Sequence, residues 1–392
     1  MSAETINGAR IVLETLHRLG VTDMFGYPGG AVIPIYDEIY SFPEIKHYFV
    51  RHEQGAAHAA DGYARVSGRV GVCLATSGPG ATNLVTGIMT AYMDSVPMVA
   101  ITGQVGRPFI GKDSFQEADI QGITMPITKH NYLVQDIHDL PRIIKEAYFI
   151  AGTGRPGPVL IDIPKDIQTE KISMTEYNKL YEVPIQLEGY DPTYKGHQGQ
   201  IKKAATLIKN AKRPLIIAGA GVLKSGAVDE LKALAETAHI PVTNTLVGLG
   251  GFPGDHELAL GMVGMHGSVA ANNSTDEADL VIAAGIRFHD RITGHPDFFC
   301  KKAKIIHIDI DPAEIDKNVT IDVPIVGDLK RVLTELNALV EPAKHEAWLE
   351  QIRQWQEEYP IVVPESTDGE LHPQYVLSEL NKIVKDDAII VS

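Results

Sequence analysis

The stretch "VGVCLATSGPGATNLVTGIMTAYMDSVPMVAITG", residues 70–103, decides the fold class of this chain. It begins with an apolar run that ends in the glycine turn at residues 77–80, continues with the apolar spacing of a helix, and ends in a second apolar run. Continuous apolar strands on both sides of a helix are typical of a parallel sheet whose two faces are covered by helices. The stretch therefore predicts an α/β fold.

The same alternation fills the first 165 residues. Its first helix is expected at residues 4–19, with an apolar face and with Gly20 as its C-terminal cap. The apolar face of that helix consists of Ile6, Ala9, Leu13 and Leu16. The other elements expected outside residues 70–103 are strands at 21–26, 44–50 and 158–164 and helices at 54–67 and near 139–151.

The alternation stops at residue 166, and the remaining chain divides into four parts. Residues 166–200 are polar and contain Tyr and Pro, which is typical of a linker. Residues 201–342 repeat the pattern and predict a second doubly wound domain, and residues 343–365 contain one exposed helix that predicts a second linker. Residues 366–392 predict a helix and the first strand of a third domain, whose remainder we expect to lie outside this chain. The fold class is thus α/β, with two doubly wound parallel-sheet domains plus the start of a third.

Charge and composition exclude some classes of function. The 392 residues carry a net charge of −15, from 50 acids and 35 bases, whereas nucleic-acid phosphates and membrane surfaces attract basic patches. Cys73 and Cys300 are far apart in sequence, which favours two thiols in a reducing compartment. The N-terminus has no apolar signal region, and no apolar run reaches the length of a membrane span. We therefore expect a cytoplasmic protein that binds no nucleic acid and no membrane.

Several motifs of the first domain fall where its strands end. They are "GYPGG", Glu53, "TSGPGATN", "GQVGRPFIGKDSFQE" and "GRPGP". Open parallel sheets bind ligands at the carboxyl ends of their strands, so these motifs predict a site. Glu53, within "RHEQGAAHAADGYAR", has two interpretations: an N-terminal helix cap, or a carboxyl group whose small Ala and Gly neighbours solvate it weakly, which favours its protonated form.

Three features of the second domain favour a nucleotide. "GAGVLKSG" at residues 219–226 resembles half of a dinucleotide fingerprint, although a tight structural turn has the same sequence. Arg287 and Arg291 follow a strand and suit a diphosphate, but can equally form surface ion pairs. "HIDID" ends a strand in acids, where a ribose hydroxyl is often held. Metal-protease, zinc, P-loop and nucleophile-elbow motifs are absent from the sequence, which argues against zinc, kinase and hydrolase chemistry.

Together these motifs resemble the large catalytic subunit of acetohydroxyacid synthase, also called acetolactate synthase, over the whole chain. The resemblance rests on "FGYPGGAVIPIYD", "RHEQGAAHAADGYAR", "TSGPGATNLVTG", "GKDSFQEADI", "GRPGPVLIDIPKD", "GMHG", "GIRFHDRITG" and "HIDIDPAEI". It implies that residues 1–165 bind the pyrimidine ring of thiamine diphosphate and that residues 201–342 bind FAD. It also implies a third domain that holds the diphosphate through Mg²⁺, with a Gly-Asp-Gly motif that this sequence lacks.

The resemblance also implies a chemistry for Glu53. In the family, the matching glutamate bonds a ring nitrogen of the aminopyrimidine and so helps the cofactor lose the proton of its thiazolium carbon. That carbon attacks pyruvate, carbon dioxide leaves, and the remaining unit joins a second 2-keto acid, pyruvate or 2-ketobutyrate. The products, 2-acetolactate and 2-aceto-2-hydroxybutyrate, belong to isoleucine and valine biosynthesis. FAD has no net redox role in this reaction.

The resemblance assigns the remaining site residues. It places Gly29, Gly30 and Gln116 at the catalytic centre with Glu53, and Pro79, Asn83 and Phe115 beside the cofactor, with residues 105–112 at the substrate entrance. The positions that match FAD contacts are Arg155, Gly219, Ala220, Gly221, Thr245, Leu246, Met265, His266, Gly285, Arg287, Arg291, Asp309 and Asp328. This sequence departs from the family at His289, where an acid is usual, and at Lys112, where a threonine is common.

The resemblance further implies a homodimer or tetramer whose active site spans two subunits, and it leaves open whether a small regulatory subunit binds. Because the diphosphate domain is expected outside this chain, the 392 residues alone are expected to have little activity. Two alternatives remain: another thiamine-diphosphate enzyme of 2-keto acids, such as a pyruvate oxidase or the FAD-free catabolic acetolactate synthase, or an FAD-binding fragment without catalysis.

Overall fold

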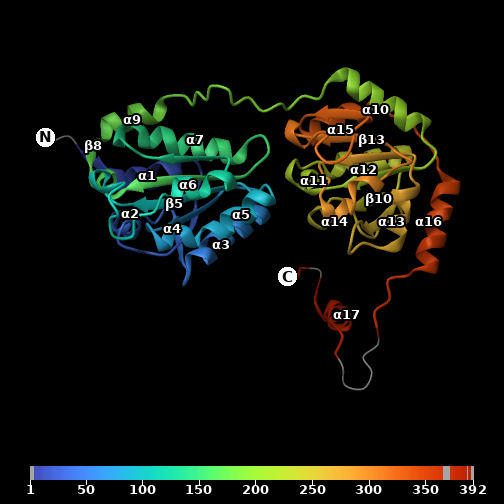
Figure 1. Cartoon of the computed structure of the whole chain (residues 1–392), viewed down its shortest axis with the longest axis horizontal. Coiled ribbons are helices and arrows are strands. Elements are labelled where there is room, and N and C mark those ends of the chain that lie inside the picture. The colour runs from blue at the N-terminus through green and yellow to red at the C-terminus, as the bar shows by residue number, and fades with distance from the viewer. Residues whose placement is uncertain (1–3, 365–370, 386, 390–392) are drawn as a thin grey trace. The chain divides into compact units, whose positions relative to one another are not determined.

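The computed structural model describes residues 4–364, 371–385 and 387–389. The chain divides into two compact units, Met1–Pro192 and Thr193–Ser392, each built on a six-stranded sheet (Figure 1). In both sheets every pair of neighbouring strands is parallel, and helices cover both faces. The predicted α/β class with two doubly wound domains is therefore confirmed.

The sheet of the first unit has the strand order β3-β2-β4-β5-β7-β6. Its central strands are apolar and buried over their whole length, as expected for strands covered on both faces. Its strands are β2 (Asp23–Gly26), β3 (Lys46–Phe49), β4 (Gly71–Ala75), β5 (Met98–Gln104), β6 (His130–Leu133) and β7 (Pro158–Pro164). Its helices from α1 to α7 are α1 (Gly8–Arg18), α2 (Ile33–Tyr40), α3 (Glu53–Ser67), α4 (Pro79–Asn83), α5 (Val85–Met93), α6 (Ile120–Thr124) and α7 (Leu140–Gly152).

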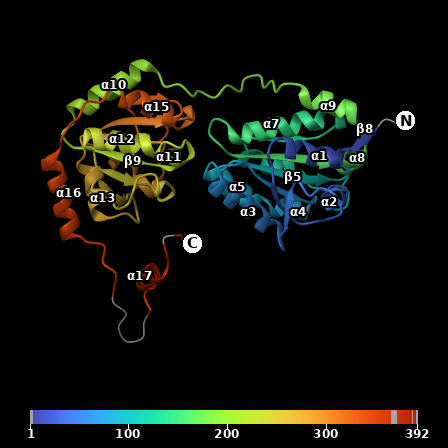
Figure 2. The same ribbon diagram turned by 180° about the vertical axis from the view of Figure 1, so that it is seen from behind.

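Helices α1 and α7 pack on one face of this sheet, and α3 and α5 pack on the other (Figures 1 and 2). Small residues let α3 approach its neighbours closely. A Cβ added to Gly71 would lie 2.1 Å from the carbonyl oxygen of Ala60, and one added to Gly87 would lie 2.4 Å from the Cβ of Ala57. The small-residue pattern of α3 is thus explained by its packing against β4 and α5.

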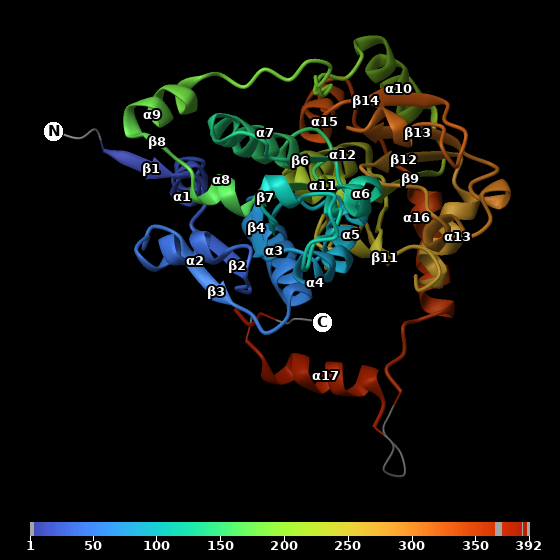
Figure 3. The same ribbon diagram turned by 60° about the vertical axis from the view of Figure 1, so that its left-hand side comes forward.

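The structure corrects the expected linker at residues 166–200. Its first half is ordered as α8 (Lys165–Thr169), β8 (Lys171–Ser173) and α9 (Met174–Glu182). Strand β8 pairs antiparallel with β1 (Thr5–Asn7), so the expected first helix also begins later, at Gly8 (Figure 3). The reason is that Ile167, Ile172 and Tyr177 are buried in the core of the first unit. Residues 183–197 are irregular, and α10 (Gln198–Asn210) begins the second unit.

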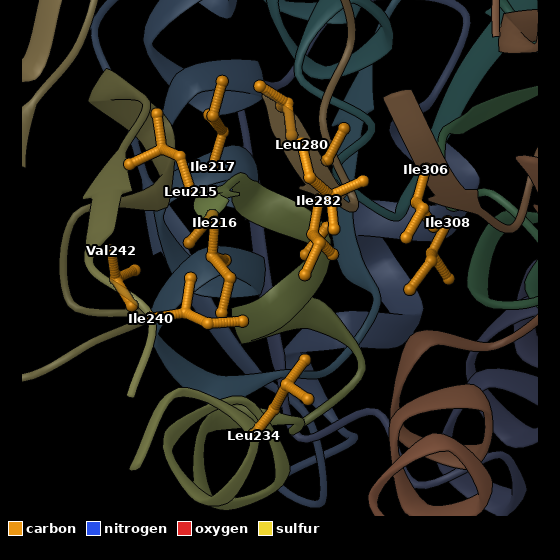
Figure 4. Close-up of a cluster of buried hydrophobic side chains, with 14 of the residues drawn as sticks. Leu215, Ile216, Ile217, Leu234, Ile240, Val242, Leu280, Ile282, Ile306 and Ile308 are labelled. Carbon is orange, nitrogen blue, oxygen red and sulfur yellow. The ribbon is translucent and has the colours of Figure 1, made fainter. Parts of the chain in front are cut away.

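The sheet of the second unit has the order β11-β10-β9-β12-β13-β14. Branched side chains from these strands pack together in its core, and Leu234 joins them from helix α12 (Figure 4). The strands are β9 (Pro214–Ala218), β10 (Val242–Asn244), β11 (Ala259–Met262), β12 (Leu280–Ala284), β13 (Lys304–Asp309) and β14 (Val323–Val326). The helices after α10 are α11 (Ala220–Lys224), α12 (Val228–Ala238), α13 (Val269–Glu277), α14 (Asp290–Thr293), α15 (Leu329–Asn337), α16 (Glu346–Glu358) and α17 (Pro373–Ile383).

Helix α16 corrects a second prediction, because it is not an exposed linker helix. Trp348, Leu349 and Ile352 are buried in the core of the second unit, and α16 packs against α13. The indole Nε1 of Trp348 donates a hydrogen bond to the carbonyl oxygen of Pro214 at 3.0 Å. The apolar residues at positions i, i+1 and i+4 form a stripe that favours docking, which the many charged residues of the segment obscured.

Helix α17 has no buried residue. The strand expected after it falls mostly outside the described residues, and residues 387–389 are not in a strand. No helix among the residues that the structure describes is both long and apolar enough to cross a membrane.

We expect Trp348→Ala to destabilise the second unit by about 3–5 kcal/mol, because it removes a buried indole and leaves the Pro214 carbonyl without its donor. Trp355→Ala is the matched control on the same helix, since Trp355 is only partly buried. Urea unfolding followed by far-ultraviolet circular dichroism measures both. Equal midpoints for the two variants would contradict the docking of α16.

Candidate active site and flavin site

In the first unit, the strand order reverses between β2 and β4. Ligands of open α/β sheets bind at the carboxyl ends of the strands at such a reversal, because the loops there diverge to opposite faces. The turn "GYPGG" follows β2, and the turn "SGPG" follows β4. The turns "GYPGG" and "SGPG" therefore meet at the point where this sheet can take a ligand. The predicted placement of "GRPGP" at the same edge is wrong, because residues 154–158 lead into β7 and so lie at the amino ends of the strands.

Thr76 joins these two turns. Its Oγ1 accepts a hydrogen bond from the N–H of Ala31 at 3.0 Å. A Cβ on Gly29 would lie 2.5 Å from the Cβ of Thr76, and a Cβ on Gly80 would lie 2.6 Å from its Cγ2. The two turns thus touch through positions that only glycine can occupy. Thr76 was not selected from the sequence, although it lies within the "TSGPG" motif.

Glu53 is the first residue of α3, and the structure excludes one of its two interpretations, the helix cap. The cap of α3 is His52, whose Nδ1 accepts a hydrogen bond from the N–H of Gln54 at 3.1 Å. The partly buried carboxyl group of Glu53 instead accepts a hydrogen bond at Oε2 from Asn83 Nδ2, at 2.9 Å. Its Oε1 lies 3.3 Å from the position that a Cβ on Gly80 would take. Glu53 therefore faces the turn after β4 and does not cap the helix with its side chain.

A buried phenol lies behind this carboxyl group. The hydroxyl of Tyr36 is 3.2 Å from Nε2 of His47, which joins α2 to β3. Burial raises the pKa of Tyr36, and the neighbouring Cys73 and Glu53 add to the rise. Tyr36 thus remains a neutral phenol, which adds no charge to the surroundings of Glu53.

The predicted entrance loop reaches the same turn through its backbone. A Cβ on Gly78, whose φ is +56°, would lie 2.6 Å from the carbonyl oxygen of Gln116. The side chains of Phe115 and Gln116 are exposed, as is Lys112. Inside the loop, the Glu117 carboxylate accepts hydrogen bonds from the N–H groups of Gly111 and Ser114, which hold its pKa below the usual value.

The structure brings together most residues predicted for this site. Glu53 and Asn83 are hydrogen bonded, Gly29 and Pro79 lie in the two touching turns, and Gln116 packs its backbone against the second turn. Gly30 is exposed with open space around it. Their catalytic roles stay predictions.

In the second unit, the order reverses between β9 and β12. A Cβ on Gly219 would lie 2.2 Å from the carbonyl oxygen of Gly285, and one on Gly221 would lie 2.6 Å from the Cα of Gly285. Gly285 itself has φ +60° and accepts a hydrogen bond from the N–H of Gly221 at 3.0 Å. The loops after these two strands are therefore in backbone contact at the reversal, and Ala220 beside them is partly exposed.

Two buried polar atoms at the end of β10 have no hydrogen-bond partner: Oδ1 of Asn244 and Oγ1 of Thr245. Buried side-chain oxygens nearly always have a partner, so unpaired ones beside a strand reversal suit a polar ligand. Asn244 was missed from the sequence, because an amide at a strand end has no motif of its own.

Other residues predicted for this site end neighbouring strands or the loops beside them. Met265 donates its N–H to the carbonyl oxygen of Arg291 at 2.9 Å, which joins "GMHG" to "RITG". Asp309 ends β13, and Asp328 caps α15 by accepting from the N–H of Arg331 at 3.0 Å. Leu246 and His266 are exposed, and Arg287 is partly buried. Arg155 belongs to the first unit, where its Nε donates to Oγ of Ser95 at 2.8 Å.

The structure gives His289 a local role. Its Nδ1 accepts a hydrogen bond from the N–H of Arg291 at 3.2 Å and so caps α14. A carboxylate at a helix cap makes the same kind of bond, so histidine replaces the usual acid without loss of the turn.

Comparison with known proteins places this geometry in a family. Residues 6–123 match the N-terminal TPP binding domain of thiamine pyrophosphate enzymes, and residues 201–336 match their central domain. The acetolactate synthase large subunit of Buchnera aphidicola is 46% identical over 393 residues, which are 99% of this chain and 68% of that protein. The chain belongs to the family of acetolactate synthase large subunits.

Other acetolactate synthases match at similar identity. The large subunit from Mycobacterium tuberculosis is 50% identical over 401 residues, and the one from Corynebacterium glutamicum is 50% identical over 391. These alignments cover 100% and 98% of this chain, but 64% and 62% of the two relatives. The chain thus spans less than two thirds of the length of these acetolactate synthases.

We expect Gly80→Ala to destabilise the first unit by about 1–3 kcal/mol through overpacking, because Thr76 cannot turn away without losing its bond from Ala31. Gly62→Ala on α3 is the matched control: nothing lies within 4 Å of its added Cβ, so the change should stabilise the helix by about 0.5–1 kcal/mol. Chemical denaturation measures both, and an undiminished stability of Gly80→Ala would show that Gly80 does not pack tightly against Thr76.

Proposed function

We propose that this chain supplies the cofactor-activating part of an acetolactate synthase. The reaction is the thiamine-diphosphate-dependent decarboxylation of pyruvate and the joining of the remaining unit to a second 2-keto acid. Its products would be 2-acetolactate or 2-aceto-2-hydroxybutyrate, in the biosynthesis of branched-chain amino acids. The observation that carries the proposal is the Glu53 carboxyl group, oriented by Asn83 beside Gly80 where the first sheet reverses.

The residues at this reversal fit an aminopyrimidine ring. Asn83 donates a hydrogen bond to Oε2 of Glu53, which leaves Oε1 as the proposed partner of a ring nitrogen. Gly30 leaves open space on the side of the first turn. When bound, thiamine diphosphate supplies the acidic carbon that attacks pyruvate and the electron sink for decarboxylation. Glu53 holds the proton that is exchanged with the ring nitrogen, and Asn83 fixes the carboxyl group in that position.

We expect Glu53→Gln to slow deuterium exchange at the thiazolium carbon of bound thiamine diphosphate by about 10²–10⁴-fold, because an amide keeps the shape but cannot take up a proton. Glu14→Gln is the control, an acid on α1 that pairs with Arg10. Quenched-flow exchange followed by proton magnetic resonance measures the rate, and a cofactor-binding titration separates lost exchange from lost binding. Unchanged exchange in a variant that still binds the cofactor would refute the role of Glu53.

We further propose that the second unit holds FAD as a structural cofactor. The support is the close backbone contact between Gly219, Gly221 and Gly285 where β9 and β12 end, which is the edge at which open parallel sheets bind ligands. The unpaired oxygens of Asn244 and Thr245 lie at the end of the neighbouring strand β10. Arg287 and Arg291 would pair with the diphosphate, and Asp309 would accept from a ribose hydroxyl. In this arrangement FAD would provide hydrogen-bond partners for the two buried oxygens that have none in the protein alone.

We expect Thr245→Val to have opposite effects on the free and the flavin-bound protein. It removes an unpaired buried hydroxyl, so the flavin-free protein should gain about 1 kcal/mol of stability, while its FAD affinity falls about fivefold to tenfold. Thr243→Val is the matched control, since the Thr243 hydroxyl donates to the carbonyl oxygen of Gly261 at 3.0 Å. That control should lose stability and keep its FAD affinity. Denaturation and a flavin-fluorescence titration measure both, and unchanged FAD affinity in Thr245→Val would contradict the flavin contact.

The residues present do not fit a resident Mg²⁺ ion. Within the described ranges, no group of three or more His, Cys, Asp or Glu side chains is placed to hold a metal ion. Ligands for Mg²⁺ outside this chain stay a prediction. Three further expectations also stay predictions. They are the low activity of the 392 residues alone, the assembly into a homodimer or tetramer, and the binding of a regulatory subunit. A cytoplasmic location is our proposal, supported by the two free, buried cysteines.

A further inference from the structure

A buried polar cluster lies at the base of the entrance loop. It consists of Thr102 and Gln104 on β5 and Asp162 on β7, which are 0%, 4% and 2% exposed. The Thr102 hydroxyl donates to Oδ1 of Asp162 at 2.7 Å, and Nε2 of Gln104 donates to its Oδ2 at 2.9 Å. The two strands are neighbours, with Thr102 directly opposite Asp162. Burying an ionised carboxyl group this deeply costs free energy unless hydrogen bonds or an opposite charge compensate it.

Gln104 connects this cluster to both ends of the loop. Its Nε2 also donates to the carbonyl oxygen of Ala118 at 2.9 Å, and its Oε1 accepts from the N–H of Val105 at 2.9 Å. Residues 105 and 118 are thus tied to one side-chain amide. Because Asp162 accepts only from the NH₂ side, it fixes which way that amide points, and a flipped amide would lose all three bonds.

The loop that is anchored in this way reaches the predicted active site. It carries Phe115 and Gln116. Gln116 has a φ of +57°, and its backbone packs on Gly78. Gly78 precedes α4, whose last residue, Asn83, holds Glu53. A change in the anchoring at Gln104 therefore acts on the turn that faces the catalytic carboxyl group.

The protonation state of Asp162 determines how strongly the hydrogen bonds of this cluster stabilise the anchored loop. Burial raises its pKa to about 7, the bonds from Thr102 and Gln104 oppose the rise, and Asp119 adds to it. Asp119 lies at the start of α6, and β5 contributes only neutral side chains. No ion pair is found for Asp162 in the described part of the chain. When protonated, Asp162 can donate to Thr102 and still accept from Gln104, since the hydroxyl can rotate.

We propose that Thr102, Gln104 and Asp162 form a positioning device, in which a proton on Asp162 keeps the 105–118 loop anchored against Gly78 and its loss lets the loop open. Opening admits water to the ionised carboxylate, so ionisation and opening are linked. Because the pKa of the anchored state is above the ordinary value of 3.8, anchoring is strongest below that value. It is lost progressively as the pH rises toward about 7. Asp162 is a positioning residue, and the effect on turnover rests on the proposed function.

The test is hydrogen exchange of the loop amides, measured by mass spectrometry on the full chain without substrate. Wild type is compared with Asp162→Asn at each pH, which cancels the intrinsic pH dependence of exchange. Asparagine can donate to Thr102 and accept from Gln104, and it cannot ionise. We expect the ratio of wild-type to variant exchange in the loop to rise about tenfold or more between pH 5 and pH 7.5.

Two further variants keep the test decisive. Glu146→Gln removes another buried carboxylate of the first unit, whose partners Arg142 and Tyr132 lie outside the loop, and should follow wild type. Thr102→Val removes a hydroxyl that stabilises the ionised form, so it should move the transition to higher pH even where Asp162→Asn fails to fold.

A flat ratio, or a loop transition that Thr102→Val does not move, would overturn the positioning device and leave the proposed reaction untouched. Unchanged thiazolium exchange in a Glu53→Gln variant that still binds the cofactor, together with the expected ratio, would instead count against the proposed reaction alone. Where acetolactate is formed, Asp162→Asn should remove a pH-dependent change in the KM for pyruvate and leave its kcat profile in place. A change in kcat alone would contradict a role in positioning the entrance.

Discussion

The site in the first unit depends on the close approach of two turns at the reversal of its sheet. The end of β2 approaches Thr76, which follows β4, because Gly29 places no Cβ against it, and Gly80 packs on the same side chain from within the second turn. That contact sets where α4 begins, and α4 places Asn83 against Glu53. The orientation of one carboxyl group is therefore determined by the absence of two side chains, and a longer turn would separate the acid from its partner.

The second unit uses the same constraint for a different purpose. Gly219 and Gly221 meet Gly285 across the reversal between β9 and β12, again where a Cβ would overlap backbone atoms. In the first unit the touching turns present a carboxyl group, whereas here they present bare backbone and leave Asn244 and Thr245 with unpaired oxygens. Each unit therefore offers such a place, and the residues around it decide which chemistry it can serve.

The parts of the fold that the sequence could predict were those with local signals. The alternation of apolar strands and helices predicted both sheets, and glycine motifs marked strand ends that the structure places at both reversals. The β1–β8 pairing was missed because its partners are far apart in sequence, and the docking of α16 was missed because three apolar residues stand among many charges. The pairing of Glu53 with Asn83 was likewise invisible, since 30 residues separate them. Such contacts depend on tertiary packing, which no local pattern encodes.

Asp162 shows why a buried acid can be kept where an amide would fit. Its neighbours Thr102 and Gln104 could satisfy an asparagine, and an asparagine would avoid the cost of burying a charge above neutral pH. An asparagine would, however, hold the 105–118 loop equally firmly at every pH. An acid whose pKa lies near 7 holds the loop by a free energy that decreases as the pH rises from 3.8 toward about 7. The instability of the buried charge is therefore the property that allows this loop to move.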